Sequence, residues 1–120
     1  MLLLAFAILS ATVAAGIVLA LLRLRGSPPH GAVGALHGVA GAAGLAVLLL
    51  GLRGPPRGVL TGVASFGAIA AVLAAVALAV GLALAVLARR SHSAVGLVIG
   101  MHATLAITAY VLLLAYVSLG

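Results

Sequence analysis

Four long apolar stretches dominate the sequence and constrain its fold more than any other feature. They cover about residues 2–22, 31–52, 58–88 and 94–119. A helix needs about 20 apolar residues, at about 1.5 Å per residue, to cross roughly 30 Å of hydrocarbon, and each stretch is long enough. Because lipid offers the backbone no hydrogen-bond partners, an apolar segment of this length crosses the membrane as a helix. The sequence therefore predicts an all-α protein with four transmembrane helices.

Short polar segments separate the stretches and end each helix. The first two contain the proline pairs Pro28-Pro29 and Pro55-Pro56, and proline does not continue a helix interior. Connections this short make consecutive helices antiparallel neighbours, so we expect an up-down-up-down bundle. The stretch over residues 58–88 is longer than one crossing requires, and we expect it to tilt or to begin in the membrane interface. The two proline-pair segments look alike, which we interpret as two helix stops and not as a duplicated half.

The composition excludes most soluble and enzymatic functions. Of the 120 residues, 67% are hydrophobic, against roughly 45–50% in soluble domains. The chain contains no Asp, Glu or Cys, and so it has no carboxylate acid–base pair, no carboxylate metal cage and no thiolate. We therefore expect one integral membrane domain, in contact with the lipid bilayer, that is not an enzyme by itself.

The only charged side chains are six arginines, all in the segments between the apolar stretches. This placement is typical of charges that flank a membrane and not of a nucleic-acid surface, so no nucleic-acid partner is expected. Two arginines, Arg53 and Arg57, lie on the side that also holds both termini, and the other four lie on the opposite side: Arg23, Arg25, Arg89 and Arg90. By the positive-inside rule, the side with four arginines is cytoplasmic and both termini are periplasmic.

The kind of membrane is indicated by composition. Arginine without lysine, together with abundant Ala, Gly, Leu and Val, is typical of bacteria with GC-rich genomes, which indicates a bacterial inner membrane. The N-terminal apolar stretch lacks a basic segment before it and reaches full spanning length, so we expect it to remain as an uncleaved first helix.

Two of the four histidines fall inside predicted helices. His37 lies roughly 9 Å past Gly31, and His102 lies roughly 12 Å past Ala94, so the two side chains are expected at similar depths on helices that run in the same direction. Such residues in hydrocarbon usually face the bundle interior and mark function. Because imidazole is the commonest metal ligand and two axial imidazoles can hold a haem iron, His37 and His102 are the predicted metal ligands.

Small residues surround both histidines. Gly34, Gly41 and Gly44 fall within about 60° of His37 on a helical projection, and Ala106 lies on the face of His102. These positions predict a slot that admits the edge of a flat macrocycle. The same pattern is also the ordinary means of packing membrane helices closely, so a purely structural interpretation remains open.

The other histidines, His30 and His92, lie in the predicted loops. A second ligand pair is one interpretation of them, and the favoured one is that they lie at the membrane interface. There they are expected to join Arg23, Arg89 and Arg90 in binding anionic groups such as haem propionates or lipid phosphates.

A four-helix bundle with one histidine on its second helix, another on its fourth, glycines beside the first and arginines at the same membrane face resembles the small bis-histidine membrane cytochromes b. The resemblance covers the architecture and the residues around His37 and His102. It implies that one haem b is bound by these two axial ligands, that the arginines bind its propionates, and that the protein passes electrons between a donor and a partner. Many members hold two stacked haems, but no histidine lies near the opposite side of this chain, so a single haem is expected.

Two further classes of function remain open at this point. One is a non-catalytic accessory subunit that packs against other membrane subunits of a respiratory or photosynthetic complex, or a homo-oligomer, either with no cofactor or with bacteriochlorophyll on a histidine. The other is a small transporter or channel. The chain lacks the membrane glutamate of small multidrug exporters and the Asn and paired Phe of fluoride channels, which disfavours this third class.

Overall fold

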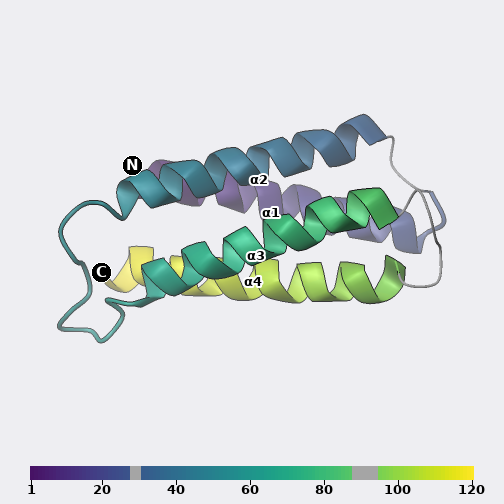
Figure 1. Ribbon diagram of the computed structural model, residues 1–120. Helices are drawn as coiled ribbons and strands as arrows, with labels where there is room; N and C mark the ends of the chain where they lie inside the picture. The colour runs from purple at the N-terminus through teal and green to yellow at the C-terminus, as the bar shows by residue number, and fades with distance from the viewer. Residues whose placement is uncertain (28–30, 88–94) are drawn as a thin grey trace.

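The computed structural model describes residues 1–27, 31–87 and 95–120. Over these ranges the protein is all-helical: α1 spans Leu2–Leu24, α2 Gly31–Gly51, α3 Phe66–Leu87 and α4 Val95–Leu119 (Figure 1). Each helix is long and apolar enough to cross a membrane. The predicted fold class, a four-helix transmembrane bundle, is confirmed. The loop residues His30, Arg89, Arg90 and His92 lie outside the described residues.

The helices form an elongated bundle with dimensions of 47 × 22 × 21 Å. The most extensive contacts join α3 to α4 and α1 to α2, so the bundle consists of two antiparallel hairpins. The hairpins meet through smaller α1–α4 and α2–α3 contacts, whereas the pairs α1–α3 and α2–α4 lie diagonally across the bundle. Both termini and the α2–α3 connection lie at one end, as the predicted up-down-up-down order requires (Figure 1).

Helix α3 begins later than the sequence predicts. The stretch expected to start at residue 58 forms turns up to Ser65, and α3 starts at Phe66. Gly58 and Gly62 have φ values of 69° and 76°, which a right-handed helix does not contain. The Thr61 hydroxyl donates to the Leu119 carbonyl oxygen at 2.9 Å, which ties this turn to the end of α4.

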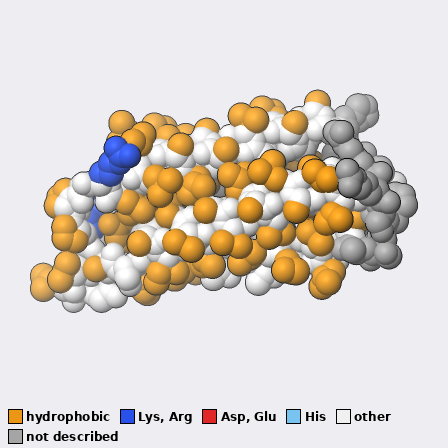
Figure 2. All heavy atoms as spheres, in the orientation of Figure 1, with side chains coloured by type: hydrophobic (Ala, Val, Ile, Leu, Met, Phe, Trp, Pro, Cys, Tyr) orange, Lys and Arg blue, Asp and Glu red, His pale blue; other side chains and the backbone are white. Residues whose placement is uncertain are grey.

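The outer surface of the bundle is apolar, and the fully buried core inside it is small. The buried cluster consists of Ala5, Leu48, Ala70, Ala71 and Leu113. Hydrophobic side chains cover the long face drawn in Figure 2, and the arginine side chains visible there lie at the end that carries the termini. A long bundle that exposes its large aliphatic side chains in this way is suited to lipid and not to water.

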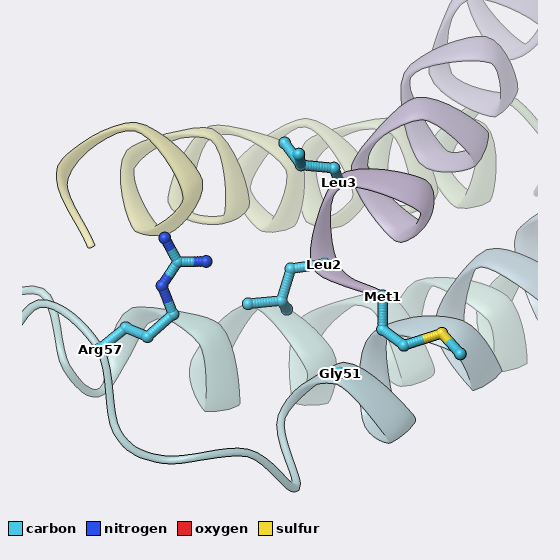
Figure 3. A pocket seen from close by; sticks show the side chains of 5 residues that line it. All are labelled: Met1, Leu2, Leu3, Gly51 and Arg57. Carbon is cyan, nitrogen blue, oxygen red and sulfur yellow. The ribbon is translucent and has the colours of Figure 1, made fainter.

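The end of the bundle that holds the termini also contains a shallow cavity of about 290 Å³ (Figure 3). Met1, Leu2, Leu3, Gly51 and Arg57 line it. The Leu2 side chain packs over Gly51, where a Cβ atom would lie 2.9 Å from Leu2 Cδ2. The side chains that line the cavity are the Arg57 guanidinium and the apolar side chains of Met1, Leu2 and Leu3, and the cavity lies at the end of α2 opposite to His37.

The two hairpins pack in the same pattern. A residue of the first hairpin corresponds to the residue 65 positions later in the second hairpin. Four buried positions of the first hairpin correspond to buried positions of the second: Ala5 and Ala70, Thr12 and Ala77, Gly44 and Ala109, Leu48 and Leu113. The contact between Leu2 and Gly51 has its counterpart between Gly67 and Tyr116, with the small and large residues exchanged. Because α1 and α3 run in the same direction, the hairpins are related by a pseudo-two-fold axis along the bundle.

Candidate functional site between His37 and His102

The structure brings the two helical histidines together. His37 lies about two turns into α2 and His102 about two turns into α4. Although these helices are diagonal partners, the centroids of the two imidazole rings are 6.1 Å apart, and the ring planes meet at 74°. The histidines are corresponding positions of the two hairpins, so the pair straddles the pseudo-two-fold axis.

Each ring packs against a glycine of the neighbouring helix in its own hairpin. A Cβ atom built on Gly16 of α1 would lie 3.0 Å from His37 Cε1, and one built on Gly81 of α3 would lie 3.0 Å from His102 Cε1. These distances are shorter than the usual 3.5–4.0 Å or so of a carbon–carbon contact. Glycine at both positions therefore lets the rings approach the backbone of the adjacent helix.

His102 is oriented by a hydrogen bond to the main chain of α3. Its Nδ1 lies 2.8 Å from the Ala77 carbonyl oxygen. A carbonyl oxygen only accepts, so this contact assigns the proton to Nδ1, which donates, and leaves a lone pair on Nε2. Metal-binding histidines are usually held in this way, with the second ring nitrogen bound to a carbonyl or carboxylate.

On the His37 side the corresponding hydrogen bond is poorly formed. The Thr12 main chain lies close enough to act on the ring, at the position that matches Ala77. His37 Nδ1 is buried, however, and it makes no hydrogen bond of ordinary length and angle with the described residues. The Thr12 hydroxyl donates to the Ile8 carbonyl oxygen at 2.9 Å and takes no part in holding the ring. The main chain is thus arranged in the same way around both rings, but the polar contacts of the two rings differ.

The other predicted site residues have different surroundings. Gly44 is buried against α1, where a Cβ atom would lie 2.7 Å from Leu9 Cδ2, and a Cβ atom on Gly41 would lie 3.6 Å from Thr12 Cγ2. Both therefore serve the packing of α1 on α2. Gly34 has open space beside it. Of the rest, Ala106 is half-buried and Arg23 is exposed at the end of α1.

Three residues that position the histidines were missed by the sequence analysis: Gly16, Gly81 and Ala77. One signal could have revealed the glycines, because Gly16 precedes His37 by 21 residues and Gly81 precedes His102 by the same number. Equal spacing across two hairpins places each glycine opposite its histidine. The role of Ala77 depends on a main-chain carbonyl, which no side-chain pattern indicates.

The chemical capacity of the site is that of two imidazoles in an apolar surrounding. No group of three or more His, Cys, Asp or Glu side chains that could bind a metal occurs in residues 1–27, 31–87 and 95–120. Two imidazoles on one metal, each with a metal–nitrogen bond of about 2 Å, have centroids about 6 Å apart, which the observed separation of 6.1 Å matches. The described residues supply no third ligand to this pair, so the other ligands of such a metal would have to come from a bound group. Comparison of the chain with protein-family models, curated proteins and solved structures found no match.

Proposed function

We propose that this protein is a membrane b-type cytochrome, or a haem-carrying electron-transfer or anchor subunit, in which His37 and His102 bind one haem b. The observation that supports the proposal is the separation of 6.1 Å between their rings across the bundle. The buried His37 Nδ1, which has no well-formed hydrogen bond among the described residues, also fits a bound group.

Each residue has a defined task in this proposal. His102 donates its Nδ1 proton to the Ala77 carbonyl oxygen and would offer Nε2 to the metal, while His37 would supply the second imidazole ligand. Arg23, with Arg89 and Arg90, binds the propionates at the same membrane face. When bound, haem b supplies one-electron oxidation and reduction between iron(II) and iron(III).

The surroundings follow from the placement of the site. His37 and His102 lie near the ends of α2 and α4 that the positive-inside rule assigns to the cytoplasmic face of a bacterial inner membrane. The protein then exchanges electrons with a partner at that face. Its apolar outer surface contacts lipid and other membrane subunits or further copies of the chain.

A second function, a non-catalytic accessory subunit without a cofactor or with bacteriochlorophyll, is favoured by a different observation. Each ring is already in contact with a glycine, and His102 is satisfied by the main chain. Histidines with only a packing role can have the same contacts.

The absorption spectrum of the purified protein, oxidised and then reduced with dithionite, separates the two functions. We expect a Soret band and a sharpened α band on reduction, both altered in His37→Ala and His102→Ala. Thr104→Ala is a matched control, because Thr104 is exposed on α4 and its hydroxyl donates only to the Gly100 carbonyl oxygen. Protein produced with haem supplied that shows no Soret band, with both histidine variants silent, would rule out the proposed cytochrome.

A further inference from the structure

The hydrogen-bonding difference between the two histidines has a structural origin in the pseudo-two-fold pair Thr12 and Ala77. Both residues are buried, and both lie one turn before the glycine that contacts a histidine. Ala77 leaves its carbonyl oxygen free for His102 Nδ1 at 2.8 Å. At the matching position, the Thr12 hydroxyl donates back to Ile8, and its methyl group lies toward Gly41, one turn beyond His37.

The threonine side chain explains why its hairpin does not form the same bond. A hydroxyl that donates to the carbonyl four residues earlier tends to bend a helix locally, and the Thr12 methyl group adds bulk between α1 and α2 that Ala77 does not have. The sequence thus keeps a carbonyl beside each ring but completes the hydrogen bond only on the α3–α4 side. His102 is anchored by a well-formed hydrogen bond, whereas His37 is held only weakly.

On the basis of the proposed function, we propose that His37 is a displaceable ligand and that a small neutral molecule binds the metal in its place. An anchored histidine loses little freedom when it binds, and loss of such an anchor typically costs about 10–100-fold in metal affinity. His102 therefore stays bound while His37 exchanges. In this step the bond between the metal and the His37 nitrogen breaks and a bond to the incoming ligand forms. The imidazole keeps its proton, and no electron is transferred.

Carbon monoxide added to the dithionite-reduced protein is the probe, because it binds ferrous haem only where an axial position can open. We expect wild-type protein to bind it with a shift of the Soret band, and His37→Ala to keep its haem and bind carbon monoxide at least tenfold more tightly. We expect His102→Ala to lose affinity for haem itself, by about 10–100-fold more than His37→Ala does.

Exchange of the pseudo-symmetric residues tests the role assigned to Thr12. Thr12→Ala gives the first hairpin the residue of the second, so His37 should gain its anchor and carbon monoxide affinity should fall about tenfold or more. Thr108→Ala is the matched control: it removes a hydroxyl that donates to the Thr104 carbonyl oxygen at 2.8 Å on the exposed face of α4, and it should leave affinity unchanged. Ala77→Thr should have the opposite effect and raise the affinity.

These outcomes separate a failure of the displaceable His37 from a failure of the proposed cytochrome function. If the wild-type protein shows no Soret band, both fail. If it shows a bis-histidine spectrum but binds no carbon monoxide, or if His37→Ala and His102→Ala weaken haem binding equally, the cytochrome stands and the displaceable His37 is refuted. If Thr12→Ala and Thr108→Ala have equal affinities, Thr12 is not the residue that keeps His37 unanchored.

Discussion

Replacing Gly81 with alanine should destabilise the bundle by forcing His102 away from Ala77. The new Cβ atom would lie 3.0 Å from His102 Cε1 and 3.2 Å from Nδ1, so the ring must move by about half an ångström to reach ordinary contact distance. That movement stretches the 2.8 Å bond from Nδ1 to the Ala77 oxygen beyond its usual range of about 2.7–3.2 Å. Overpacking costs about 1–3 kcal/mol and the lost hydrogen bond about 0.5–1.5 kcal/mol, whereas alanine regains about 1 kcal/mol of helix propensity. The net loss in the free energy of unfolding is about 0.5–3.5 kcal/mol.

The same substitution at Gly16 should cost less, and the difference isolates the hydrogen bond. A Cβ atom on Gly16 would also lie 3.0 Å from the Cε1 atom of its histidine, His37. Because His37 Nδ1 has no hydrogen-bond partner among the described residues, its ring can shift without breaking a bond. Gly81→Ala is therefore expected to be more destabilising than Gly16→Ala by about 1 kcal/mol.

Unfolding of the purified protein by sodium dodecyl sulfate in mixed micelles, followed by far-ultraviolet circular dichroism, measures this difference. The chain has no tryptophan, so the helical signal is the appropriate probe. Gly100→Ala is the control, because a Cβ atom there would meet no atom within 4 Å, and it should not destabilise the protein. If Gly16→Ala destabilises as much as Gly81→Ala, the assigned difference between the histidines is incorrect.

Three further predictions concern the packing and the orientation of the bundle. Tyr110→Phe removes the 3.0 Å hydrogen bond between the Tyr110 and Ser10 hydroxyls, and it should lower the free energy of unfolding by about 0.6–1.7 kcal/mol in the same assay; no change would show that the bond does not stabilise the α1–α4 contact. Gly44→Ala places a Cβ atom 2.7 Å from Leu9 Cδ2 and should lower the free energy of unfolding by about 1–3 kcal/mol. An unchanged stability would show that α1 and α2 can move apart to accommodate the added methyl group. Since the chain has no cysteine, Ser27→Cys introduces a unique thiol. We expect a membrane-impermeant reagent to label this thiol only from the cytoplasmic side. Labelling in intact cells would show that the orientation is the opposite of the predicted one.

Much of the fold follows from the pattern of apolar stretches. Helices α1, α2 and α4 begin and end within two residues or so of their predicted limits, because proline pairs and arginines mark those limits in the sequence. The predicted start of α3 at residue 58 was wrong, because residues 58–65 are as apolar as a transmembrane helix and the sequence gives no sign of a turn there. Only the left-handed backbone at Gly58 and Gly62 reveals the turn.

The candidate site was predicted in part. Helix length and direction placed His37 and His102 at similar depths, and the structure brings the two rings within 6.1 Å. The glycines predicted beside His37 were chosen from its own helix, whereas Gly16 and Gly81, which contact the rings, come from the neighbouring helices. A projection of one helix cannot identify residues of another.

The sequence by itself determined that the chain forms four apolar helices in antiparallel order, because hydrocarbon leaves the backbone of such stretches no other way to satisfy its hydrogen bonds. It also determined that His37 and His102 lie within the second and fourth of these helices, at similar depths near one membrane face. The tertiary structure decided which faces meet, and so that the diagonal helices α2 and α4 direct their imidazoles toward each other. It alone decided that His102 makes a well-formed hydrogen bond to a carbonyl oxygen while His37 does not. That difference depends on the approach of α3 to α4 and of α1 to α2, which side-chain packing sets and which local sequence does not encode.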